Sequence, residues 1–375
     1  MRETKPESVT LSIGGVSWSG WESCQVVKSV DSMAGAFALG LTDRTCHGGV
    51  RLPIAPGMDC LLETNGDHLV KGYIDKVEHS LTSSSHGIRV DGRDSSADLV
   101  DCSAVHRPGQ WRDMNVLSLA MEIASPFGVQ VAADADASAI VPSFQISPGE
   151  TAAKALQRLL KLRGLLAMPD SSGGLRLATL GTSRMAGAVI EGVNVLSCTT
   201  KYDASKRYSE YICTGQKQGA DTAFGEACSV RGQASDGQIG RYRPLIVRPG
   251  QQGSADFMRR RAQWELSTRR AQGTTVDVSV RGWRDEGGRL WTPGAMVKVS
   301  LPTMGLDQDL LIAEVTLTKS MQGTVASLSL KDPAAYSPEP AESGKVSSAE
   351  SGSLDIYVRQ SRDAKAAGES VKEAL

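Results

Sequence analysis

The chain has 375 residues, of which 40% are hydrophobic and 22% are charged, and its formal net charge is -1. This length exceeds a single usual hydrophobic core and predicts two to four domains. The near-neutral balance excludes a global attraction to nucleic acid or to an anionic membrane surface. No apolar run reaches the roughly 18 to 20 residues that span a bilayer, so we expect no membrane insertion.

The first residues, Met1 to Pro6, lack the apolar stretch of a secretory signal, which predicts synthesis and retention in the cytoplasm unless lysis or a dedicated machine releases the protein. The cysteine count is odd and no pair has C-x-x-C spacing, so we expect reduced and mostly buried thiols. The seven are Cys24, Cys46, Cys60, Cys102, Cys198, Cys213 and Cys228.

Short alternating strands separated by glycine-rich turns run from Val9 to about Cys102. The segment Val9–Ile13 alternates cleanly, and Gly14 with Gly15 forms the turn that follows. This pattern is typical of an antiparallel sandwich or barrel. It predicts a first β-barrel over residues 1–102.

A mixed segment follows, and we expect it to form a small αβ module over residues 103–192. Apolar residues at helical spacing predict a helix over 113–124. A second helix is expected after Ser147, with Glu150 completing a capping box. Two short strands over 165–178 are expected to pair as a hairpin.

A three-strand meander occurs twice, about 240 residues apart. The first copy covers 56–94 and the second covers 293–332, and each begins with Pro-Gly and ends at an aspartate. The lengths of the strands match although the residues differ. We therefore expect two related barrels in one chain; the alternative is that any two meanders look alike.

A further match upstream of each meander sets the expected limits of the second barrel. Asp31 precedes the strand-like run 37–41, and Asp203 precedes the run 208–212. The second barrel is accordingly expected over 193–215 and 274–336, and the sequence in between reads as an insertion.

The expected insertion, residues 216–273, is basic and includes a predicted helix from about 254 to 272. From Ser337 onward the chain is rich in Pro, Ser, Glu and Gly, so residues 337–375 are interpreted as a linker and C-terminal tail. The basic residues are Arg241, Arg243, Arg248, Arg259, Arg260, Arg261, Arg269 and Arg270.

No motif points to catalysis, a metal or a cofactor. The five histidines have no H-E-x-x-H spacing. Cys102 and His106 are close in sequence, which does not establish a catalytic pair. No G-x-S-x-G and no phosphate-binding glycine loop occurs. We expect a protein that is not an enzyme and has no catalytic, metal or cofactor residues.

The residues singled out as a candidate subunit or partner interface belong to two groups. Arg93 and Asp94 end a strand, where fixing a turn or a subunit contact is favoured over a ligand role. The arginine cluster of the insertion favours a solvated helix or a protein interface over nucleic-acid binding, because it lacks interleaved aromatics. This second group is Arg259, Arg260, Arg261 and Trp264.

The order and spacing of several motifs resemble the baseplate hub proteins of contractile-tailed phages, in particular the Mu-like tail proteins. The resemblance covers about residues 8–336 and extends to the N-terminal hub part of VgrG-type secretion spikes. The motifs that carry it are Gly72–Asp75, Val90–Asp94, Asp98–Ala104, Gly149–Thr151, Arg163–Leu166, Arg260–Glu265, Gly282–Arg284, Leu290–Gly294 and Gly323–Thr324.

The resemblance implies a mainly β fold with α+β insertions: two similar antiparallel β-barrels plus a small αβ module. It implies a homotrimer whose six barrels form a pseudo-sixfold ring in the virion baseplate, after assembly in the host cytoplasm. The ring would join the tail tube to the trimeric central spike and contact other baseplate proteins, the tape measure protein being a further candidate. DNA would pass through the lumen without sequence-specific binding.

One departure concerns the C-terminus. The secretion-spike relatives continue into a spike on the same chain, whereas only 337–375 follows here, so we expect a separate spike protein and a docking arm in this tail. Two alternatives stay open: a cell-wall or carbohydrate-binding module of a tail-associated lysin, suggested by Trp264, Trp283 and Trp291, and the hub of a contractile secretion or bacteriocin-like particle.

Overall fold

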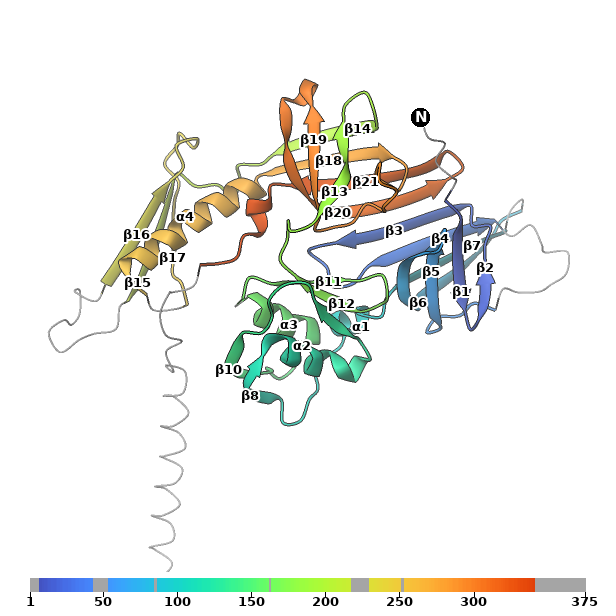
Figure 1. The fold of residues 1–375 in the computed structure, drawn as a ribbon, viewed down its shortest axis with the longest axis horizontal. Helices are drawn as coiled ribbons and strands as arrows, with labels where there is room; N and C mark the ends of the chain where they lie inside the picture. Colours follow the sequence, from blue (N-terminus) through green and yellow to red (C-terminus); the bar gives the residue numbers. More distant parts are fainter. Residues whose placement is uncertain are drawn as a thin grey trace, which may run out of the picture. The chain divides into compact units, whose positions relative to one another are not determined.

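A computed structural model describes residues 7–42, 53–83, 86–161, 163–216, 229–250 and 253–340 of the chain (Figure 1). Most strands belong to one sheet of 13 strands, and three smaller sheets lie outside it. The mainly β fold class is therefore confirmed. The large sheet has two halves of similar plan, which correspond to the two expected barrels and are called the first and second barrel below.

The first barrel forms where polar and apolar residues alternate, so that every second side chain faces the core. In the last of its strands, Ile88 and Val90 are buried while Arg89 between them is exposed. The turn at Gly14 and Gly15 has positive φ at both residues, which glycine adopts without strain. The strands are β1 (Val9–Ile13), β2 (Val16–Trp18), β3 (Ser23–Ser29), β4 (Ala36–Thr42), β5 (Asp59–Thr64), β6 (Asp67–Leu81) and β7 (His86–Asp94).

The αβ module begins earlier than expected. Its first helix packs Leu99 into the module's own core, so the expected boundary at 102 is too late. Asn115 caps the second helix by accepting from the Ser118 amide at 2.7 Å, which starts this helix after a strand rather than at 113. The elements are α1 (Ala97–Asp101), β8 (Gln110–Asn115), α2 (Val116–Ala124), η1 (Ser125–Phe127), β9 (Val131–Ala133), β10 (Ile140–Gln145), α3 (Ala152–Lys161), β11 (Leu166–Pro169) and β12 (Leu175–Ala178).

The expected hairpin of the module is confirmed, because β11 and β12 pair antiparallel from Leu166–Ala178 to Pro169–Leu175. The capping box before α3 is formed in part: the Ser147 amide donates to Glu150 Oε2 at 3.0 Å. Thr151 then caps the helix through the Lys154 amide.

The second barrel differs from the expectation at its start. Strand β13 pairs with β19 in the large sheet, so 184–190 belongs to this barrel and not to the αβ module, and this pairing is parallel. The remaining pairs are antiparallel. The elements are β13 (Arg184–Ile190), β14 (Val195–Tyr202), β18 (Thr274–Arg281), β19 (Met296–Leu301), η3 (Pro302–Met304), β20 (Leu306–Ser320), β21 (Gly323–Lys331) and η4 (Pro333–Tyr336).

The expectation that 208–212 is a strand of the second barrel is wrong. Residues 210–212 of this run lie in β15, which pairs with β16 and β17 in a separate three-stranded sheet. The counterpart of β4 is instead β18, which follows the insertion and pairs with β21 as β4 pairs with β7. The insertion comprises β15 (Glu210–Gln216), β16 (Ser229–Ser235), β17 (Pro244–Val247) and α4 (Ala255–Gln272).

The predicted helix of the insertion is confirmed almost to the residue. Ser254 caps α4 by accepting from the Phe257 amide at 3.2 Å, and Gly273 follows its last turn. Phe257, Met258 and Ala262 face the small sheet and form its core with Tyr211. The insertion therefore has a core of its own, while one continuous core serves both barrels.

Candidate assembly interface

The two meanders share details that strand length alone does not require. Gly57 and Gly294 both have φ of 84°. The Gly57 amide donates to the Ile74 carbonyl at 2.7 Å, and the Gly294 amide donates to the Ile312 carbonyl at 2.8 Å. A bulge follows each isoleucine at the same point of the ladder. A bulge is a specific local feature of a strand pair, so two bulges at the same position favour a true repeat over two unrelated meanders.

Strand lengths agree as well: β5 and β19 have 6 residues, β6 and β20 have 15, and β7 and β21 have 9. Ile74 and Ile312 are offset by the same 238 positions as Asp94 and Asp332. From the isoleucine to the aspartate the two meanders therefore correspond residue by residue, whereas Gly57 and Gly294 before them are offset by 237 positions.

The two barrels meet at a strand junction inside the chain. The second half of β20, Glu314 to Lys319, pairs antiparallel with β3 from Ser29 to Cys24, and the two strands lie side by side in Figure 1. Leu317 of β20 lies opposite Val26 of β3, and both side chains are buried. We call this pairing the internal junction.

The strands that correspond to β20 and β3 are β6 and β14. In the part of the chain that is described, each of these two strands has an edge without a partner strand. The second half of β6, from Lys76 to Leu81, pairs with β7 along one edge, and β5 pairs with β6 only as far as Tyr73. Strand β14 pairs only with β18. Exposed strand edges are templates for pairing with another chain.

Arg93 and Asp94, which the sequence singled out together, have different surroundings. Arg93 donates to Asp75 Oδ2 at 2.5 Å and to Asp101 Oδ2 at 2.7 Å, which raises the pKa of Arg93. It thereby ties the bulge of β6 to the end of α1. The partners of Arg93 that the structure shows lie within the chain.

Asp94 is fully buried and accepts a hydrogen bond from the Gly35 amide at 2.7 Å. Burial raises the pKa of Asp94 to about 6, against the opposing pull of the Lys28 ammonium. Burial likewise lowers the pKa of Lys28, which lies near both Asp94 and Asp170. Lys28, Asp94 and Asp170 together connect the first barrel to the β11–β12 hairpin of the αβ module.

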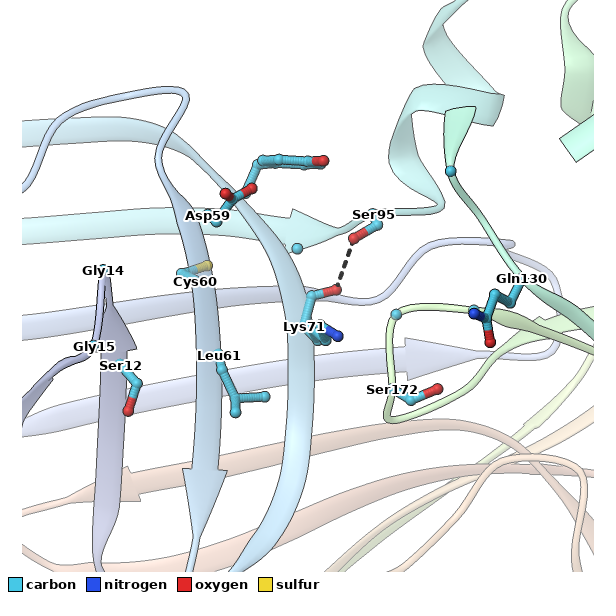
Figure 2. Close-up of a pocket in the computed structure, with 15 residues that line it drawn as sticks. Ser12, Gly14, Gly15, Asp59, Cys60, Leu61, Lys71, Ser95, Gln130 and Ser172 are labelled. Carbon is cyan, nitrogen blue, oxygen red and sulfur yellow. Dashed lines mark hydrogen bonds between the residues drawn. The ribbon is translucent and has the colours of Figure 1, made fainter. Parts of the chain in front are cut away.

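Figure 2 shows the hollow beside this hairpin, which has a volume of about 630 Å³. The β1–β2 turn, β5, β6 and the loop Ser172–Gly174 line it, and the Ser95 hydroxyl donates to the Lys71 carbonyl at 3.2 Å. Its ionisable side chains are those of Asp59, Cys60, Lys71 and Tyr73. The hollow lies where the first barrel and the αβ module meet.

The arginine cluster divides into two exposed residues and one buried residue. Arg259 and Arg260 are exposed, and both pair with Asp256 one turn earlier in α4. Arg261 is buried and donates to Glu265 Oε1 at 3.0 Å, which confirms the expected i, i+4 pair. For Arg261 the solvated-helix interpretation is wrong, because its guanidinium lies over the ring of Trp264, 4.5 Å from the centroid.

Trp264 and Arg261 hold the segment Pro333–Glu339, which we call the strap. The Trp264 indole donates to the Ser337 carbonyl at 2.9 Å, and Glu339 pairs with Arg261. Glu339 also lies 3.3 Å from Lys161 Nζ of the αβ module. The strap thus connects the insertion to the module, and the linker expected from Ser337 cannot begin before residue 340.

Tyr336 fastens the start of the strap to the first barrel. Its hydroxyl donates to Asp31 Oδ2 at 2.9 Å, and Lys331 Nζ lies 3.5 Å from the same oxygen. The strap is not predictable from the sequence, because Glu339 stands in a stretch of linker-like composition and Tyr336 immediately precedes it.

The other tryptophans and the histidines show no arrangement of a binding site among the residues described. Trp283 and Trp291 are buried in the barrel core, as core anchors are. His79 and His86 stack with centroids 6.1 Å apart, while His47 lies outside the described residues. Among the residues described, no three His, Cys, Asp or Glu side chains gather in a way that could hold a metal ion, and none of the helices is both long and apolar enough to cross a membrane.

Four family models match successive parts of the chain. They are the N-terminal domain of Mu phage baseplate assembly protein GpP-like proteins over residues 8–94, the second domain of baseplate hub protein gp44-like proteins over 96–179, the third domain of tail protein NMB1110-like proteins over 207–264, and the fourth domain of Mu phage baseplate assembly protein GpP over 254–339.

Comparison with individual proteins gives the same answer. The chain is 33% identical over 322 residues to the baseplate hub protein gp44 of Escherichia phage Mu, covering 83% of each sequence. It is similar to the 43 kDa tail protein of prophage MuSo2 from Shewanella oneidensis, with 31% identity, a TM-score of 0.78 and coverage of 88% of this chain and 99% of that one. A tail protein from Neisseria meningitidis MC58 shares the fold, with 23% identity, a TM-score of 0.76 and coverage of 89% and 99%.

Proposed function

This chain belongs to the family of baseplate hub proteins of Mu-like phages, which are structural proteins of the virion tail, and from that premise we propose that three copies close into a ring of six similar barrels. The observation that carries the proposal is the residue-level agreement of the second and third strands of the two meanders, including the bulge after Ile74 and after Ile312. A threefold assembly can imitate sixfold symmetry only if each chain supplies two similar surfaces.

The ring acts as a symmetry adaptor between two neighbours. Its six barrels offer near-equivalent positions to a sixfold tail tube, while the threefold repeat of whole chains fits a trimeric central spike. Closed cyclic symmetry also covers strand edges that a monomer leaves open. The adaptor needs no catalytic group, and DNA would pass through its lumen without base-specific contacts.

The insertion offers a second surface for neighbouring baseplate proteins, with the tape measure protein as a further candidate on the tube side. Arg259 and Arg260 are suited to this role because their side chains are 69% and 42% exposed on α4. Arg261 and Trp264 are not, since they hold the strap within the chain.

A docking arm for the spike is proposed in residues 341–375. The earlier limit at Ser337 is revised because Ser337 and Glu339 are part of the strap. Truncation after Pro340 should leave the ring intact and weaken capture of the purified spike protein in a pull-down. Equal capture by the truncated and full-length chains would remove the docking-arm role and leave the ring proposal untouched.

Imaging tests the ring directly. Averaged electron micrographs of the purified chain, viewed down the symmetry axis, should show six lobes with threefold differences between alternate lobes. Particles with a single barrel pair and no rotational symmetry would contradict the proposal.

A further inference from the structure

We infer that the second half of β6 pairs with β14 of the next copy of this chain in one defined register, so that the internal junction is repeated between subunits. This inference rests on the proposed ring and specifies the interface that closes it. Each subunit would contribute β6 to one neighbour and β14 to the other, a head-to-tail contact of the kind that closes into a ring.

The register follows from three steps of observed pairing. Thr316 of β20 corresponds to Glu78 of β6, because their partners Ser327 and Arg89 have the same 238-residue offset. The residue that Thr316 faces across the internal junction is Val27 of β3. The residue of β14 that corresponds to Val27 is therefore expected to face Glu78.

Val27 pairs with Ala36, which pairs with Arg93. Lys201 pairs with Thr275, which pairs with Lys331, the counterpart of Arg93. Lys201 therefore takes the place of Val27, and Glu78 faces Lys201 of the partner subunit. The remaining expected pairs with the partner subunit are Lys76 with Asp203, Val77 with Tyr202, His79 with Thr200, Ser80 with Thr199, and Leu81 with Cys198.

Charge complementarity supports this register independently of the superposition. On one face of the sheet it places Glu78 opposite Lys201 of the partner subunit and Lys76 opposite Asp203 of the partner subunit. Oppositely charged residues directly across an antiparallel pair are favourable, and like charges are not. The side chains of Lys76, Glu78 and Lys201 are exposed by half or more. Within the chain Lys76 pairs with Glu78 and Lys201 pairs with Asp277, and the proposed register adds a partner across the interface to each.

Apolar groups on the other face support the same register. Leu81 is 83% exposed and Tyr202 is 70% exposed, although each ends a strand of the barrel sheet. Their neighbours Val77 and Cys198 already pack against the barrel core. Pairing would therefore extend that core across the interface, as Leu317 and Val26 do at the internal junction.

Disulfide trapping tests the register in the full-length chain. Ser80→Cys with Thr199→Cys places thiols on residues expected directly opposite each other, where β-carbons are about 4.5 to 5.5 Å apart. Ser80→Cys with Ser197→Cys is the matched control, because Ser197 is also exposed but lies two residues out of register. Both are made in a Cys102→Ser background, since Cys102 is an exposed free thiol.

The expected result under mild oxidation is covalent dimers and trimers from the matched pair, formed about tenfold faster than from the control, since disulfide formation needs close β-carbons. Variants with one added cysteine should give neither. If the chain is a trimer by mass and the matched pair does not cross-link faster than the control, the register is overturned. A chain that stays monomeric overturns the ring itself, so the two failures are distinguishable.

Discussion

Cys24 and Cys198 occupy the same position in the two barrels of this chain. Cys24 pairs with Leu39 of β4, and Cys198 pairs with Val278 of β18, the strand that corresponds to β4. Cys24 lies in a junction that the chain completes by itself, with Lys319 opposite. Cys198 lies on an edge that lacks such a strand in the described part of the chain, and this asymmetry is the basis of the proposed assembly.

Charge reversal at the expected junction should be rescued by a second reversal. Glu78→Lys places like charges opposite each other, and we expect it to raise the concentration at which trimers dissociate by about tenfold, as does Lys201→Glu. The double variant should recover part of this loss, because it restores an opposite-charge pair across the interface but leaves like charges beside Lys76 and Asp277 within each chain. Analytical ultracentrifugation over a dilution series measures this; reversal at Arg184, which is exposed and pairs with Asp309 away from the junction, is the control.

If the double variant is as weak as the sum of the two single variants, Glu78 and Lys201 do not meet between subunits. Circular dichroism melts of each variant separate a loss of assembly from a loss of folding.

His79 takes the place that Leu317 has at the internal junction, where the leucine is 5% exposed. We therefore expect His79→Leu to strengthen the trimer, because the apolar side chain extends the core across the interface without desolvating an imidazole. The same dilution series measures the gain. His68→Leu, a change at an exposed histidine near the start of β6 and away from the junction, should have no such effect. Equal gains would mean that the leucine acts through non-specific hydrophobic association.

Loss of Glu339 should destabilise the fold without affecting the ring contacts. Glu339→Gln removes the carboxylate that pairs with the buried Arg261 and with Lys161, and we expect a loss of about 1 to 2 kcal/mol in the free energy of unfolding. Urea denaturation measures it. Glu286→Gln, at an exposed loop position, is the matched control; equal effects of the two changes would show that the strap adds no stability.

The stability of the chain should depend on pH through Asp94. Because burial raises the pKa of Asp94 to about 6 from an ordinary 3.8, the folded state holds more protons at this carboxyl than the unfolded state does between those values. The contribution of Asp94 to stability therefore falls as pH rises through about 4 to 6, by up to about 1.4 kcal/mol per pH unit.

Asp94→Asn keeps an acceptor for the Gly35 amide and removes the titration, so the difference between variant and wild type should change across that window. Urea midpoints at pH 4.5 and pH 7 measure it. Parallel pH profiles for the two proteins would show that Asp94 titrates as an ordinary carboxyl.

Reversal of the exposed arginines should affect partners and leave the fold unchanged. Arg259→Glu with Arg260→Glu alters two side chains that pair only with the neighbouring Asp256, so the melting temperature should stay within a few degrees while binding to neighbouring baseplate proteins falls. Pull-down from a tail extract reports the binding. Tight DNA binding by the wild type, lost in the variant, would show that the arginines bind nucleic acid instead.

Much of the architecture was predictable because periodicity and turn residues encode it. Ser254 and Gly273 mark the ends of α4, and the Pro-Gly steps before β5 and β19 identify the two meanders. The insertion was harder to place, since its strand β15 has the same alternation as a barrel strand and only long-range pairing decides its sheet. Glu339 and Lys28 depend on contacts across the fold, which no local pattern reports.

The solution mass of the purified chain, measured by light scattering, tests the proposed ring directly. We predict a species of three times the 39.7 kDa chain mass, formed by the chain alone or on addition of the spike protein. A particle that remains at the mass of one chain in both conditions would contradict the ring, and with it the assignment of the two free strand edges to subunit pairing.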